Sequence, residues 1–238
     1  MSKIKEFFLV LISSLLLFMM CNTKYNKALG DYVLEYIGIQ SWSNGEMGLH
    51  LTVVYFGILF ILSLFFVNYY LNKKGIGKRN AFFLFVLLII VFNLGTNTYT
   101  KNLKANAEGL LAIGLEYKDS KIDYSYTNNE YKDFSVYFTL INYSSENKMF
   151  YVSIMSPGYE EKEVDTIRFY NVDGSEAMFT LGGHETREIK VLLEDYVIQG
   201  EKSFQNISVS GMIQELVLTD TDGNRVKLSE DFLGETLQ

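Results

Sequence analysis

Residues 48–71 read GLHLTVVYFGILFILSLFFVNYYL, a run of 24 residues without Asp, Glu, Lys or Arg. At about 1.5 Å per residue, a helix of this length spans roughly 36 Å, which exceeds the hydrocarbon core of a bilayer at about 30 Å. The run therefore predicts a membrane-spanning helix that is tilted in the bilayer. Because such a helix commits the chain to a membrane, this stretch decides the class of the fold.

A further apolar block begins at residue 81, and uncharged residues continue it over 81–99, which makes 19 residues. This length also predicts a spanning helix. The first block, 7–20, has only 14 residues, a length equally typical of the core of a secretion signal. Bulky side chains precede Cys21, whereas signal cleavage and cysteine lipidation both require small ones. We therefore predict an uncleaved helix over about 4–21, with a cleaved signal as the alternative.

Lysines and arginines in short loops indicate orientation, because they are retained on the cytoplasmic side. Cations precede the first block and fill the loop between the second and third blocks; they are Lys3, Lys5, Lys73, Lys74, Lys78 and Arg79. The sequence thus predicts a multi-pass protein of the cell membrane with a cytoplasmic N-terminus. Residues 22–47 then form an outer loop, 72–80 form a cytoplasmic loop, and the C-terminal half is extracytoplasmic.

The chain changes character near residue 104. Residues 1–104 carry 10 Lys+Arg and 4 Asp+Glu, a net charge of +6, whereas residues 105–238 carry 11 and 24, a net charge of −13. We predict a membrane domain over 1–104 and an extracytoplasmic domain over 105–238. An acidic domain repels phosphate, which argues against nucleic acid as a partner and keeps the domain off anionic headgroups.

Cys21 is the single cysteine, so no disulfide can form within the chain. Extracytoplasmic domains without disulfides are ordinary in bacteria and less common in eukaryotic secretory proteins. The cysteine count therefore favours a bacterial source.

The outer loop holds a second helical pattern. Apolar side chains recur at helical spacing at Tyr25, Leu29, Val33, Tyr36 and Ile37. The pattern predicts a helix that lies in the membrane interface, with Trp42 as an aromatic anchor. The alternative is that this helix packs on the spanning helices or on the β domain.

The apolar blocks contain no Asp, Glu, Lys or Arg at membrane depth, where transport and proton-relay proteins keep ionisable groups. Their polar residues are Ser13, Ser14, His50, Thr52, Ser63, Asn68 and Asn93. Ser and Thr commonly bond to their own helix or bridge to a neighbour, so we assign this set to packing. His50 lies at the edge of its block, which favours an interfacial position over a relay. The helices are interpreted as an anchor that can also dock a partner.

From Phe134 the C-terminal half alternates between two faces, which is the period of a β-strand. We predict strands over 134–141 and 150–154, joined as a hairpin by the polar turn 142–147. Further strands are predicted at 122–126, 166–170, 177–181, 188–193, 204–209, 216–219 and 225–228. About nine short antiparallel strands are typical of a β-sandwich of immunoglobulin-like type.

Two Asp-Gly pairs, at Asp173 and Asp222, stand between predicted strands, where glycine accepts the positive φ of a tight hairpin turn. The second pair lies in Asp220–Asn224, whose alternating oxygens resemble part of a calcium loop. Gly223 follows the second ligand rather than the third, and position twelve is Asp231 instead of Glu. The hairpin interpretation is therefore favoured over calcium.

No nucleophile elbow and no paired His or Cys ligands occur in the C-terminal half, so the sequence predicts no catalytic, cofactor-binding or metal-binding residue. His184 stands alone in a connection between two predicted strands and is interpreted as solvated. The acidic run 160–163, beside Pro157 and Gly158, is interpreted as a solvated loop.

Three hypotheses of function remain. The favoured one is a non-enzymatic cell-envelope protein whose acidic β-sandwich binds another envelope or membrane protein, or serves as an accessory subunit of a membrane complex. The second is a carboxylate-type hydrolase of envelope glycans, which requires two carboxylates across an aromatic-lined cleft. The third is a signal-relaying or immunity-type membrane protein whose helices dock a partner.

Overall fold

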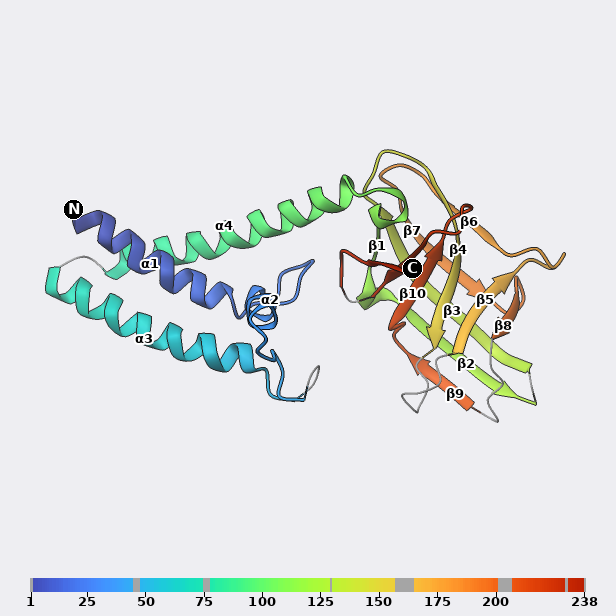
Figure 1. Ribbon diagram of the computed structural model, residues 1–238, viewed down its shortest axis with the longest axis horizontal. Coiled ribbons are helices and arrows are strands. Elements are labelled where there is room, and N and C mark those ends of the chain that lie inside the picture. The colour runs from blue at the N-terminus through green and yellow to red at the C-terminus, as the bar shows by residue number, and fades with distance from the viewer. Residues whose placement is uncertain are drawn as a thin grey trace. The chain divides into compact units, whose positions relative to one another are not determined.

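The computed structural model describes residues 2–44, 48–74, 78–128, 130–156, 165–200, 207–229 and 231–237. The chain folds as two compact units, Met1–Thr100 and Lys101–Gln238. The first unit is helical, and the second, here the β unit, consists of antiparallel strands (Figure 1).

The helical unit contains α1 (Ser2–Phe18), α2 (Leu29–Tyr36), α3 (Leu51–Lys74) and α4 (Lys78–Ala105), whose last turn belongs to the β unit. Two of these helices, α3 and α4, are long and apolar enough to cross a membrane, with mean hydropathies of 2.3 and 2.0. Among the described residues, only 6% of each apolar window is buried. The two helices match the predicted spans at 48–71 and 81–99.

The helices contact one another through a few small clusters. Val10 of α1, Leu71 of α3 and Ala81 of α4 form one of them. The rings of Phe18 and Phe92 pack at a centroid distance of 5.5 Å. The hydroxyls of Ser13, Ser14 and Ser63 donate to carbonyls of their own helices, as predicted. Thr52 is different, because its hydroxyl donates to a side chain outside its helix.

The first sheet of the β unit is built on the long strand β3 (Glu130–Asn142). On one side β3 pairs with β7 (Thr186–Leu192), and on the other with β1 (Ile113–Leu115) and β2 (Lys121–Thr127); β2 then pairs with β9 (Ile207–Gly211). The second sheet is centred on β4 (Lys148–Ser156) and β10 (Glu215–Thr219). Its other strands are β5 (Asp165–Tyr170), β6 (Met178–Leu181), β8 (Val197–Gly200), β11 (Arg225–Leu228) and β12 (Glu235–Leu237).

Alternate residues from both sheets form one apolar core, which makes the unit a sandwich of antiparallel sheets. Phe138 and Leu140 of β3 and Phe150 and Ile154 of β4 are each fully buried in it. Every predicted strand overlaps a strand of the structure, with residues 204–206 of one prediction outside the described residues. The short strands β1, β8 and β12 were not predicted; all three residues of β1 are buried, so it shows no alternation.

The predicted hairpin between 134–141 and 150–154 is wrong. β3 and β4 lie in different sheets: β3 pairs with β7, whereas β4 pairs with β10. Residues 143–147 therefore carry the chain from one sheet to the other. The physical reason is that both strands bury one face in the same core, and they do so from opposite sides.

The two Asp-Gly turns have different roles. Gly174 and Gly223 both adopt the predicted positive φ, at +86° and +87°. The second turn joins β10 to β11 as a hairpin with Thr219 opposite Arg225, as predicted. Across the first turn, Tyr170 and Glu176 face each other in a single antiparallel bridge, whereas β5 and β6 themselves both pair with β4, one after the other along its length.

A buried lysine ties the last turn of α4 to the rest of the β unit. Lys104 is 1% exposed, and its ammonium donates to the carbonyl oxygen of Leu233 at 2.8 Å. It also lies 5.5 Å from the ring centroid of Phe232. An ammonium removed from water needs such partners, so this contact holds the C-terminal segment before β12 against the helix end.

Candidate functional site

A buried carboxylate lies at one end of the helical unit. The side chain of Asp31 on α2 is 3% exposed. Its Oδ1 accepts the hydroxyl of Thr52 at 2.5 Å and lies 2.7 Å from Nε2 of His50. The Trp42 ring stacks on His50 at a centroid distance of 4.2 Å and an interplanar angle of 12°. We call Asp31, Trp42, His50 and Thr52 the Asp31 cluster.

A short antiparallel contact places His50 beside Asp31. Trp42 and His50 face each other in a β-bridge. The backbone N–H of Ser43 donates to Leu49 at 3.0 Å, and that of Leu51 donates to Ser41 at 2.8 Å. These bonds end at the first turn of α3, where Thr52 is fully buried. The loop backbone thus presents the imidazole and the hydroxyl to the same carboxylate oxygen.

Gly30 allows α2 to approach closely enough for these bonds. Its N–H donates to the carbonyl of Met19 at 2.9 Å. A Cβ atom at this position would lie 2.5 Å from Cγ2 of Thr52 and 2.6 Å from the Met19 carbonyl oxygen. Glycine at position 30 is therefore required by contact rather than by backbone angle.

The ion pair between Lys27, just before α2, and Glu35 of α2 is more exposed than the carboxylate of Asp31. Lys27 contacts Glu35 at 2.8 Å, and the two side chains are 44% and 43% exposed. The hydrogen bond from Lys27 holds the pKa of Glu35 below its usual range. The small stabilisation from this pair is lost as the pH falls through that lowered pKa. Ser41 also donates to Glu35, at 2.9 Å.

The Asp31 cluster joins α2 to the first turn of α3. Oδ1 of Asp31 accepts the hydroxyl of Thr52 and contacts Nε2 of His50. Both bonds lie in a site shielded from water, where hydrogen bonds are stronger. Chemically the cluster is a clamp for α2.

Sequence reasoning missed Asp31 because it searched for ionisable groups only inside the three apolar blocks. His50 was predicted to be interfacial, and the structure shows in addition that its Nε2 contacts Asp31. The available signal was an acidic residue directly after a glycine in a largely apolar segment, Leu29–Tyr36. This signal does not identify the contact from the sequence alone, because the partners of Asp31 lie 19 and 21 residues away along the chain.

Replacement of Gly30 by Ala is expected to push α2 away from α3 and to weaken the Asp31–Thr52 bond. We expect a loss of about 2 kcal/mol in the stability of this segment, as is usual for overpacking. Gly57→Ala on α3 is the matched control, because its Cβ would meet only Met20 Sδ at 3.6 Å, an ordinary contact. Fluorescence of Trp42, the single tryptophan, measures the change; equal spectra for both variants would contradict the expectation.

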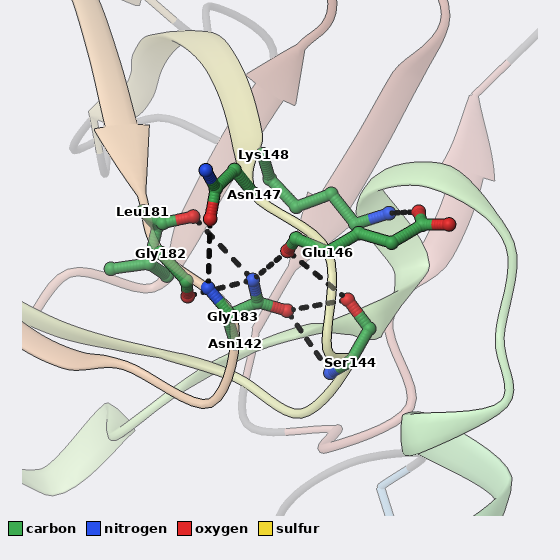
Figure 2. A network of polar contacts seen from close by, with 8 residues as sticks. All are labelled: Asn142, Ser144, Glu146, Asn147, Lys148, Leu181, Gly182 and Gly183. Carbon is green, nitrogen blue, oxygen red and sulfur yellow. Dashed lines mark hydrogen bonds and ion pairs between the residues drawn. The ribbon is translucent and has the colours of Figure 1, made fainter.

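The β unit contains a second polar network, centred on Asn142 (Figure 2). This side chain is at the end of β3 and is 1% exposed. Its Nδ2 donates to the carbonyls of Glu146 at 2.6 Å and Gly182 at 2.9 Å. Its Oδ1 accepts the N–H and the hydroxyl of Ser144 at 3.0 and 2.9 Å. We call this the Asn142 lock.

The lock joins the β3–β4 connection to the β6–β7 connection. The N–H of His184 donates to Ser144, and the N–H of Gly183 donates to Oδ1 of Asn147. The N–H of Gly182 bonds to Glu185 and holds the pKa of that carboxyl below its usual range. A Cβ at Gly183 would overlap the Ser145 carbonyl. The two loops are thus held in contact, which redirects the chain between the sheets.

A hollow of about 320 Å³ in the β unit is lined by residues 105–109 and by Ser144, Ser145, Glu146 and Lys148. Two carboxylates, of Glu108 and Glu146, belong to this lining, but no aromatic ring does. Glu146 pairs with Lys148 at 2.8 Å. The hollow therefore lacks the aromatic wall that the glycan hydrolase hypothesis requires.

The remaining candidate residues are accounted for by local structure. His184 is exposed, at a positive φ of 56°, in the predicted connection between two strands. Asp220 accepts the N–H groups of Asp222 and Asn224 at 2.9 and 2.8 Å, as a hairpin turn requires. Within the described parts of the chain, no three His, Cys, Asp or Glu side chains group as metal ligands do. The acidic run 160–163, with Pro157 and Gly158, lies outside the described residues.

A comparison of the chain with protein-family models, with curated proteins and with solved structures found no match.

Proposed function

We propose that this chain is a non-enzymatic membrane protein of the cell envelope that presents its β unit to a protein partner on the outer side. In this proposal α1 crosses the membrane together with α3 and α4. The N-terminus and the α3–α4 connection face the cytoplasm. The β unit is an immunoglobulin-like sandwich that binds another envelope protein or serves as an accessory subunit of a membrane complex.

The arrangement of the helical unit supports this topology. Figure 1 shows the N-terminal end of α1 at the same end of the unit as the α3–α4 connection. Lys73, Lys78 and Arg79 flank that connection. The positive-inside rule therefore favours a cytoplasmic position for this end of the helical unit, which includes the N-terminal end of α1. α1, with 17 residues, reaches roughly 26 Å, close to the hydrocarbon thickness.

One observation supports protein binding most directly, namely an apolar patch on the outer face of the second sheet. Met149 of β4 and Met178 of β6 are each 51% exposed, and Val197 of β8 is 43% exposed. Tyr151 stands opposite Met178, and Tyr170 stands opposite Val197. We call these five residues the methionine face.

Such a patch is unexpected on a unit in which residues 105–238 carry a net charge of −13. Exposed apolar clusters on soluble domains mark interaction sites, and methionine adapts its shape to varied partners. The polar groups of the Asn142 lock, by contrast, bond to one another and so stabilise the fold. The methionine face is therefore the surface through which the β unit binds in this proposal.

Labelling in intact cells tests the proposal. Met178→Cys is introduced into a Cys21→Ser chain and treated with a membrane-impermeant, thiol-reactive photocrosslinker. We expect labelling from outside, followed by a crosslink to one dominant protein. Ser208→Cys on β9 is the control, because Ser208 is exposed on the opposite sheet. It should be labelled equally but form no such crosslink.

Two results would count against the proposal. Failure of both cysteines to label in intact cells, with labelling after lysis, would place the β unit in the cytoplasm. Equal crosslinking from both positions would show that the methionine face has no special partner.

A further inference from the structure

Helix α2 buries the carboxylate of Asp31 and exposes most of its apolar side chains, and Glu35 is exposed beside them. Asp31 is 2% exposed and Leu34 5%, and Gly30 is also buried. On the other side Val33 is 39% exposed, Tyr36 is 93% exposed, and Ile37, just after the helix, is 59% exposed. A surface helix of a protein in water normally does the reverse. The arrangement is stable only if the surroundings of the exposed side are apolar.

The contacts of α2 place it at the ends of two apolar helices. The bond from Gly30 to Met19 joins it to the chain directly after α1. Thr52, which bonds to Asp31, lies in the first turn of α3, a helix long and apolar enough to cross a membrane. A segment held at this level lies at the boundary between hydrocarbon and headgroups.

The exposed surface of α2 also continues onto a surface of the same kind. Within the first two turns of α3, Val53 is 45% exposed and Tyr55 is 45% exposed. Leu29, another residue of the stripe predicted from the sequence, is 38% exposed and belongs to the same surface. Lys27, two residues before α2, is 44% exposed and can reach the headgroup region with its ammonium.

We propose that α2 lies in the plane of the membrane, with Val33, Tyr36 and Ile37 immersed in outer-leaflet phospholipid and the Asp31 cluster turned away from the lipid. This inference rests on the membrane placement of the proposed function. Phospholipid is the occupant, because the exposed side chains are apolar and aromatic and lie level with the ends of α1 and α3. The Asp31 cluster then acts as the clamp that sets the rotation of α2 about its axis.

Spin-label accessibility tests this assignment in the full-length chain. The Cys21→Ser protein is reconstituted in vesicles of phosphatidylcholine and phosphatidylglycerol, with a nitroxide at Tyr36→Cys or, independently, at Ile37→Cys. Collisions with oxygen report lipid, and collisions with a water-soluble nickel chelate report water. Ile58→Cys on α3, 56% exposed, is the lipid reference, and Val172→Cys in the β unit, 84% exposed, is the water reference.

We expect the collision ratio at positions 36 and 37 to be shifted from the water reference toward oxygen, in the direction of the lipid reference. A ratio like that of position 172 would overturn the inference, because α2 would then face water. Shielding from both reagents would also overturn it, in favour of cover by a second copy or by the β unit. If position 58 itself collides with nickel, the membrane placement fails, and the inference fails with the proposed function. Unchanged Trp42 emission verifies that each labelled chain is folded.

Discussion

Replacement of Asn142 by Ala is expected to lower the stability of the β unit by about 3–4 kcal/mol. The side chain is buried and serves both connections at once, with donors to Glu146 and Gly182 and an acceptor for Ser144. Its removal leaves backbone groups without partners in a site with little access to water. Hydrogen exchange of β3 and β7 amides, followed by mass spectrometry in detergent, measures the loss.

The matched control is Asn147→Ala in the same connection. Asn147 is exposed and accepts one bond, from Gly183 at 3.1 Å, so its loss should cost about 1 kcal/mol or less. Asn142→Asp is informative as well, because it keeps the acceptor for Ser144 and places an oxygen against two carbonyls. We expect it to be as damaging as Ala. Equal exchange rates for Asn142→Ala and Asn147→Ala would refute the structural role of the lock.

Replacement of Asp31 by Ala is expected to release α2 from the start of α3, at a cost of about 3 kcal/mol. Thr52 is fully buried and loses its acceptor, while His50 loses its bond to the carboxylate. Trp42, stacked on that imidazole, should then show a red-shifted emission, and amides of residues 29–44 should exchange faster. Fluorescence and hydrogen exchange therefore report the same event independently.

Glu35→Ala is the matched control on the same helix. Its pair with Lys27 is more than two-fifths exposed, so the expected cost is about 1 kcal/mol or less. Asp31→Asn should give an intermediate effect, because an amide oxygen still accepts from Thr52 but carries no charge. An Asp31→Ala protein with the emission and exchange of the unmodified chain would mean that the cluster does not hold α2.

Local features of the sequence were sufficient for most elements of the fold. The uncharged run 48–71 predicts α3 because its length and composition match a bilayer without reference to any other part of the chain. Alternation over 134–141 predicts β3 for the same reason, since a strand with one buried face repeats every second residue. Gly174 and Gly223 predict turns because the tolerance of positive φ is a property of glycine itself.

Local sequence patterns could not predict which strands pair with each other. The pattern of β3 specifies which side chains face the core but not which strand lies beside it, so the chain neighbour β4 was a reasonable and incorrect choice. That choice depends on contacts between distant parts of the chain, such as the bonds of Asn142 to Leu181 and Gly182, 39 and 40 residues away.

The Asp31 cluster shows most clearly which features follow from the local sequence and which depend on the tertiary structure. Helical spacing over 29–37 is visible in the sequence, and so is the apolar stripe. Which side of that helix turns inward depends on the hydroxyl of Thr52 and the imidazole of His50, which come from a later segment. Periodicity is a short-range property of the chain, whereas the pairing of a carboxylate with its donors exists only once the helices have packed.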